Sequence, residues 1–139
     1  MNTPQHSPLA FIGGGNMASA IIGGLIQKGL PASLIDVVEP YAPQRDKLNS
    51  QFPGVTVMEA AGTGLARAAL VVWAVKPQTF KDAALACAAH TAGALHLSVA
   101  AGIRSDSMAD WLGKPAWMWL SFLGIVMALL ALITFGKVA

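Results

Sequence analysis

Up to Gly113 the chain alternates short apolar runs with longer amphipathic segments. This alternation is typical of β-α-β units, in which parallel strands are buried between helices. It predicts strands at 9–12, 34–38, 55–57, 69–75 and 94–99, and helices over about three turns after Gly15, around 44–48, at 79–89 and at 105–112. The predicted fold class is therefore α/β, with a parallel sheet and flanking helices.

Two of these segments carry the strongest pattern. Residues 69–75 are continuous, apolar and rich in β-branched side chains, as expected of a strand buried on both faces. In the helix after Gly15, five apolar side chains recur at helical spacing and share one face: Ala18, Ile21, Ile22, Leu25 and Ile26. That face is predicted to pack on the sheet.

After Gly113 the pattern changes. Residues 115–136 carry no charge, and Lys114 and Lys137 stand at either side. These 22 residues would form a helix of about 33 Å, enough for a bilayer core of about 30 Å, with Trp117 and Trp119 at one interface. We therefore expect an α/β domain over 1–113 and one hydrophobic, membrane-spanning helix, Ala116 to Phe135, within 114–139. The alternative is a helix buried in a protein core.

Composition narrows the class of protein. Charged residues make up 12% and apolar residues 55% of the 139 positions, against about 25% and about 45–50% in typical globular proteins. This excludes a disordered tail or a nucleic-acid-binding arm. Residues 1–113 contain seven basic and seven acidic side chains, so the net charge of +2 comes from the two lysines beside the hydrophobic segment. The single cysteine, Cys87, is predicted to be a small buried side chain in a reducing compartment.

A glycine-rich motif follows the first predicted strand. Residues 13–18 read Gly-Gly-Gly-Asn-Met-Ala and fit the pattern G-x-G-x-x-A where a strand ends and a helix begins. The first glycine allows a tight turn, the second lets the backbone approach a pyrophosphate, and Ala18 permits close packing of helix on strand. The free N–H groups of the helix start would face the phosphates. The alternative is a glycine turn without a ligand.

An acidic residue is expected at the end of the second strand, where it would bind a ribose. Glu39 lies there, 24 positions after Gly15. A carboxylate favours the free 2′-hydroxyl of NAD, whereas Arg45, Lys47 and the polar Gln44 would favour a 2′-phosphate. The pattern leaves NADH and NADPH open, and it also allows that Glu39 merely ends a strand.

Two further segments end strands at the edge where ligands bind in α/β sheets. Residues 75–78 follow the fourth strand and include Lys76, and the small residues from Ser98 to Ile103 follow the fifth. The histidines, His6, His90 and His96, have no carboxylate or cysteine at ligand spacing. We expect structural or surface roles for them and no metal site.

Together, FIGGGNMASAIIGGL, VVEP, AVKPQ and SVAAGI closely resemble the N-terminal half of the pyrroline-5-carboxylate reductase family, over about residues 9–113. The resemblance implies a Rossmann-like fold, a cytoplasmic location, and NAD(P)H-dependent reduction of 1-pyrroline-5-carboxylate to proline. The residues that it places around NADPH or NADH are Ile12, Gly13, Gly14, Gly15, Asn16, Met17, Glu39, Ala74, Val75, Lys76, Pro77, Val99, Ala100 and Ala101. It points to no catalytic side chain in this chain.

The family's helical half, which begins near a Met-Pro-Asn-Thr-Pro stretch and forms the imine pocket, has no counterpart after Gly113. We therefore expect a truncated reductase that is weakly active or inactive alone, and that binds the cyclic imine only if a helical domain is supplied. One alternative is a vestigial or membrane-tethered dinucleotide-binding module, held at the cytoplasmic side of the inner membrane. Another is the product of a truncated reading frame.

Overall fold

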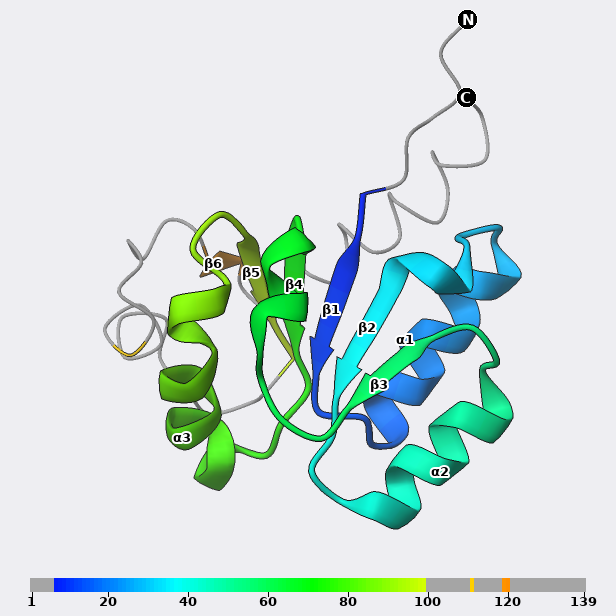
Figure 1. The fold of residues 1–139 in the computed structure, drawn as a ribbon, viewed down its shortest axis with the longest axis horizontal. Coiled ribbons are helices and arrows are strands. Elements are labelled where there is room, and N and C mark those ends of the chain that lie inside the picture. Colours follow the sequence, from blue (N-terminus) through cyan, green and yellow to red (C-terminus); the bar gives the residue numbers. More distant parts are fainter. Residues whose placement is uncertain (1–6, 100–110, 112–118, 121–139) are drawn as a thin grey trace, which may run out of the picture.

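The computed structural model describes residues 7–99, Trp111 and Trp119–Leu120 (Figure 1). Its strands and α-helices are β1 (Leu9–Ile12), α1 (Asn16–Gln27), β2 (Ile35–Val38), α2 (Ala42–Gln51), β3 (Thr56–Met58), β4 (Leu70–Trp73), α3 (Pro77–Cys87), β5 (Leu95–Ser98) and β6 (Trp119–Leu120). Short 3₁₀ helices, η1 (Ala32–Leu34), η2 (Thr63–Arg67) and η3 (Ala88–His90), precede β2, β4 and β5.

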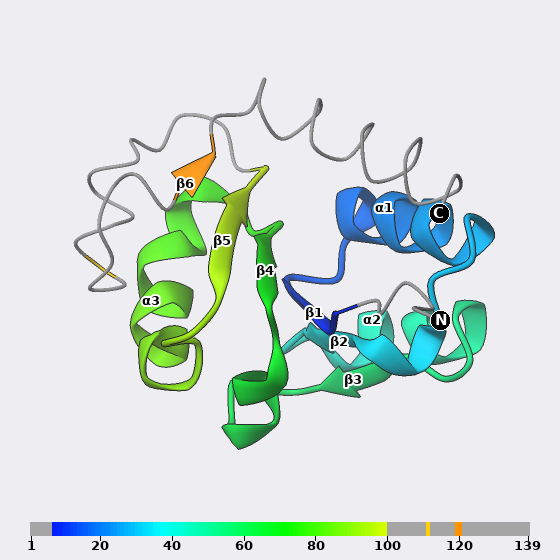
Figure 2. The ribbon, with the colours of Figure 1, turned by 90° about the horizontal axis from the view of Figure 1, so that it is seen from above.

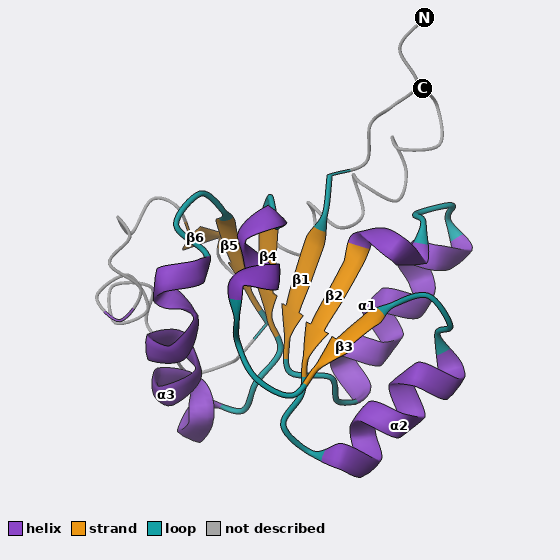
Figure 3. Ribbon diagram, in the orientation of Figure 1, coloured by secondary structure: helices purple, strands orange, loops and turns teal. Residues whose placement is uncertain are grey.

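The described strands form one parallel sheet in the order β3-β2-β1-β4-β5-β6 (Figure 3). The chain builds the sheet outward from β1 to β3, then crosses back and continues from β4. This order is that of the Rossmann fold, and it puts the change of direction between β1 and β4, where dinucleotides bind beyond the carboxyl ends of the strands. The predicted α/β, Rossmann-like parallel sheet is confirmed.

Hydrophobic clusters cover both faces of the sheet. Phe11 of β1 packs with Ile22 of α1 and Leu48 of α2, whereas Ile12 turns to the other face and joins the cluster of Phe80 from α3. Successive side chains of a strand point to opposite faces, so β1 contributes to both clusters. Figure 2 shows α1 and α3 on opposite sides of β4. This packing fixes the strand ends on which the candidate site is built.

Element boundaries differ from the predictions by one to three residues. β2 begins at Ile35, β3 runs from Thr56, and β4 occupies only Leu70–Trp73 of the predicted 69–75. The helix α3 begins at Pro77, two residues earlier than predicted, because proline lacks an N–H that the first turn of a helix leaves unpaired. The apolar pattern locates the elements but not their ends.

The prediction of one hydrophobic helix over 116–135 is wrong at Trp119 and Leu120. These residues form β6, which pairs in parallel with His96 and Leu97 of β5. The open edge of β5 offers unpaired backbone groups, and an apolar run without periodicity does not distinguish a strand from a helix. Residues 112–118 and 121–139, and the predicted helix at 105–112 except the helical Trp111, lie outside the described residues. Within the described part, every helix is too short or too polar to cross a bilayer.

Candidate functional site

The glycine loop connects β1 to α1 at the carboxyl end of β1. Gly13 has a φ of +96°, and a Cβ added to it would lie 2.6 Å from the carbonyl oxygen of Ala74. Its N–H donates to the carbonyl oxygen of Val38 at 2.8 Å. Only glycine fits this left-handed conformation so close to a neighbouring backbone. The loop therefore turns tightly between β2 and β4.

Gly14 and Gly15 are surrounded differently. A Cβ on Gly14 would lie 2.5 Å from Cδ1 of Leu48 and 3.1 Å from Cγ1 of Val37, so a side chain there would displace Leu48 of α2 and crowd Val37 of β2. Gly15 has a φ of −76°, which any residue adopts, and no described atom beyond its two chain neighbours lies within 4 Å of its added Cβ. The fold needs no glycine at position 15, and open space adjoins its backbone.

Helix α1 begins beside this space. Gly15 is its N-cap and supplies no side-chain hydrogen bond, and the first turn contains no acidic residue. The first-turn N–H groups of a helix have no partners within the helix, and they carry its positive dipole end. Asn16 and Met17 are exposed. The uncapped turn and the open space beside Gly15 fit an anion such as a pyrophosphate.

Glu39 directly follows β2, and its half-buried carboxylate reaches the glycine loop. Oε1 accepts the N–H of Gly14 at 3.1 Å, and Oε2 accepts the N–H of Tyr41 at 3.0 Å. Each carboxylate oxygen retains a lone pair for a further donor. Arg45 donates from Nη1 to the carbonyl oxygens of Glu39 at 2.9 Å and Pro40 at 2.7 Å. An acid and a guanidinium therefore lie together at the end of β2, where a ribose is expected.

Gln44, a candidate from the sequence for binding a 2′-phosphate, contacts the glycine loop. Its Nε2 donates to the carbonyl oxygen of Gly14 at 2.6 Å. The signal available in the sequence was its place in the first turn of the helix that follows Glu39. Lys47, the other side chain considered for a 2′-phosphate, is exposed.

The ends of β1, β4 and β5 meet next to the loop. The N–H of Ala74 donates to the carbonyl oxygen of Ile12 at 2.9 Å, and the N–H of Val99 donates to the carbonyl oxygen of Trp73 at 3.0 Å. Ala74, Val75 and Val99 are half-buried, Lys76 is exposed, and Pro77 begins α3. Ala100 and Ala101, the remaining residues of the predicted set, lie outside the described residues. The structure thus brings the described members of the set to one edge of the sheet.

Of the other reactive side chains considered from the sequence, His96 and Cys87 lie in the packed interior. His96 is fully buried, and its Nδ1 accepts the indole N–H of Trp73 at 3.0 Å. Burial raises the pKa of the Cys87 thiol to about 11. His90 is half-buried in η3, and His6 lies outside the described residues. No group of three or more potential ligands that could hold a metal ion occurs in the described part of the chain.

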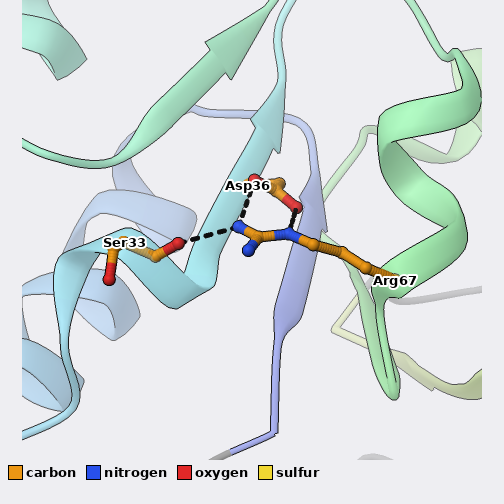
Figure 4. Close-up of polar contacts among 3 residues, drawn as sticks. All are labelled: Ser33, Asp36 and Arg67. Carbon is orange, nitrogen blue, oxygen red and sulfur yellow. Dashed lines mark hydrogen bonds and ion pairs between the residues drawn. The ribbon is translucent and has the colours of Figure 1, made fainter.

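An ion pair at the opposite end of the sheet was not predicted. Arg67 of η2 donates two hydrogen bonds of 2.8 Å to the carboxylate of Asp36 and a third, also 2.8 Å, to the carbonyl oxygen of Ser33 (Figure 4). The hydrogen bond to Asp36 raises the pKa of Arg67. The two residues are 31 positions apart, and no local pattern signals such a pair. It joins β2 to the segment before β4.

Comparison with known proteins matches residues 8–102 to the family described as "NADP oxidoreductase coenzyme F420-dependent". The chain belongs to this family. The pyrroline-5-carboxylate reductase of Pseudomonas aeruginosa is 43% identical over 116 residues, which are 83% of this chain and 41% of that protein. The reductase of Haemophilus influenzae is 37% identical over 105 residues, 75% of this chain and 38% of its own length. The predicted resemblance to these reductases is confirmed.

Solved structures agree with this assignment. A pyrroline-5-carboxylate reductase from Coxiella burnetii matches 79% of this chain and 41% of its own, with 32% identity and a TM-score of 0.73. The chain therefore spans about two fifths of the length of the relatives that it matches. The expected cofactor, NADPH or NADH, is confirmed as the class that this oxidoreductase family uses.

Proposed function

We propose that the chain binds a reduced nicotinamide dinucleotide along the carboxyl edge of its sheet. The pyrophosphate lies beside Gly15 and the first turn of α1, the adenine ribose beside Glu39, and the nicotinamide beside Val99 and the segment after β4. The open space beside Gly15 is the observation that carries this proposal. Packing disfavours a side chain at positions 13 and 14, whereas position 15, at the start of α1, leaves room for a ligand close to the backbone.

The chain's own residues bind and orient the cofactor in this proposal. The first-turn N–H groups of α1 bind the phosphates, and Glu39 accepts a hydrogen bond from the ribose. Ala74 and Val99 present backbone and small side chains to the flat nicotinamide ring. When bound, the dinucleotide supplies the hydride.

The proposed reaction is the reduction of the C=N bond of 1-pyrroline-5-carboxylate to give proline. The names of the relatives support this substrate. Hydride transfer needs donor and acceptor carbons at about 3–3.5 Å, and such positioning lowers the barrier by about 7–11 kcal/mol. The edge of the sheet that would hold the nicotinamide belongs to the part of the chain that matches the reductases, and this part corresponds to about two fifths of their length. We propose that the 139-residue chain binds its cofactor but turns over slowly until a helical domain completes the imine pocket.

Titration of the purified chain with NADPH and NADH, followed by an assay of imine-dependent NADPH oxidation, tests both parts of this proposal. We expect saturable binding of at least one cofactor, and oxidation close to the uncatalysed rate. If the chain binds neither NADPH nor NADH, the proposed dinucleotide site is refuted. An ordinary enzymatic rate by the chain alone would refute the need for a separate imine-binding domain.

A second candidate function is a membrane-tethered dinucleotide-binding module without catalysis, facing the cytoplasm. The observation that favours it is the uncharged run over residues 115–136 between two lysines. A membrane tether would place this segment in the bilayer, whereas the β6 pairing holds two of its residues, Trp119 and Leu120, in the sheet. If Trp119 and Leu120 stay in the sheet, the uncharged residues 121–136 give a helix of only about 24 Å, short of a bilayer core of about 30 Å.

A further inference from the structure

The two backbone polar groups of Gly14 are both held by side chains. Its N–H donates to Oε1 of Glu39 at 3.1 Å, and its carbonyl oxygen accepts Nε2 of Gln44 at 2.6 Å. Leu48 and Val37 close around its Cα, since a Cβ there would lie 2.5 Å and 3.1 Å from their nearest atoms. The peptides on either side of Gly14 are therefore fixed in orientation by β2 and α2.

The orientation of the second peptide determines what Gly15 presents. The described residues contain no cis peptide bond, and in a trans peptide the C=O and N–H groups point in opposite directions. The hydrogen bond from Gln44 to the carbonyl oxygen of Gly14 therefore turns the N–H of Gly15 away from α2. No hydrogen bond recorded between described residues uses that N–H, whereas the carbonyl oxygen of Gly15 accepts the N–H of Ser19 at 2.9 Å.

We propose that Gln44 is a positioning residue for the dinucleotide site, one that acts through the Gly14–Gly15 peptide and makes no contact with the cofactor. This inference rests on the proposed function, because it assumes that the N–H of Gly15 meets the pyrophosphate. The amide suits the role, because it donates a hydrogen bond without placing a charge beside the site. The backbone N–H of Gln44 donates to the carbonyl oxygen of Tyr41 at 3.1 Å and so anchors the side chain in the first turn of α2.

Gln44→Met in the full-length chain tests the proposal. Methionine is close to glutamine in length, is uncharged and favours helices, but it has no N–H donor. Gln51→Met is the matched control, because Gln51 is exposed at the other end of α2. We expect the Kd values for NADH and for NADPH to rise together by about three- to tenfold in Gln44→Met, which corresponds to one lost hydrogen bond. Gln51→Met should bind both cofactors as the wild type does.

An amide spectrum supplies a readout that general destabilisation does not move. In ¹⁵N-labelled protein, the Gly15 amide resonance should shift in ligand-free Gln44→Met but not in Gln51→Met, while resonances of β3 and α3 stay in place. The proposal would be overturned if Gln44→Met bound both cofactors with the wild-type Kd values and its Gly15 resonance did not shift. Weakened binding of NADPH alone would also overturn it, because Gln44 would then contact the 2′-phosphate directly. If the wild-type chain binds neither dinucleotide, the proposed function itself fails, and the positioning role fails with it.

Discussion

At the scale of single residues, the Glu39 side chain both holds the glycine loop through a hydrogen bond and places a negative charge beside the proposed site. Its carboxylate accepts the N–H of Gly14, and it lies where the adenine ribose is expected. Removing the side chain therefore changes two interactions at once. A test of cofactor preference has to separate the charge from the hydrogen bond.

Glu39→Gln and Glu39→Ala make that separation. The glutamine amide oxygen can still accept from Gly14 and the side chain carries no charge, although its NH₂ group cannot accept from Tyr41 as Oε2 of Glu39 does. We expect the affinity for NADPH to rise relative to that for NADH, because repulsion of a 2′-phosphate is relieved. The alanine variant also loses the loop contact and should bind both cofactors less tightly. Fluorescence titrations of the two variants with both cofactors measure these changes. An unchanged NADPH to NADH ratio in Glu39→Gln would mean that Glu39 does not face the ribose.

Cys87 predicts a dependence of stability on alkaline pH. The thiol has an ordinary pKa of 9.0, and burial raises it to about 11 in the folded chain. Between these values the unfolded thiol ionises while the folded one stays protonated, so ionisation stabilises the unfolded state. The contribution is fully present below about pH 9 and is lost as the pH rises towards 11. Urea denaturation should show a shallower decline over this interval for Cys87→Ala than for the wild type. Parallel declines would contradict the assignment.

At the scale of elements, the Asp36–Arg67 pair joins two segments that share no strand pairing. The Asp36 side chain is 4% exposed and that of Arg67 is 43% exposed. Arg67→Met leaves the carboxylate without its two donors, and it should lower the free energy of unfolding by about 1–3 kcal/mol, less than for a fully buried pair because Arg67 is partly solvated. Arg67→Lys keeps the charge and should lose less. Urea denaturation measures both, and equal stability of Arg67→Met and wild type would show that the pair contributes nothing.

The elements that the sequence predicts well are those with a local cause. The glycine turn, the apolar face of α1 and the apolar run of β4 each lie within one stretch of chain, and all three elements occur where they are predicted, β4 with fewer residues. The contacts that no local pattern predicts join positions far apart in the sequence. The bonds from Gly14 to Glu39 and to Gln44 span 25 and 30 residues, and β6 pairs with a strand more than 20 residues earlier. Hydrophobic periodicity contains no information about such partners.

At the scale of the whole molecule, the membrane-tethered candidate makes a prediction of its own. If the uncharged segment spans a bilayer, the full chain should remain in the pellet after carbonate extraction. Val126→Arg, near the middle of the run, should move it to the supernatant, because a charge at the centre of a span costs about 2.5–3.5 kcal/mol. Recovery of the wild-type chain in the supernatant as a single species would contradict the tether and favour the sheet pairing of β6.

The central claim is that a dinucleotide lies against Gly15, and calorimetric titration of Gly15→Val with NADPH and NADH tests it most directly. Valine tolerates the backbone angles of this position, and its Cβ would lie more than 4 Å from every described atom beyond the neighbouring residues, so the free energy of unfolding should stay within about 0.5 kcal/mol of the wild type. Gly62→Val is the matched control, because the Cβ at Gly62 also points into open space, at the start of η2. We expect Gly15→Val to lose binding of both cofactors while Gly62→Val keeps it. Undiminished binding by a folded Gly15→Val variant would contradict the account.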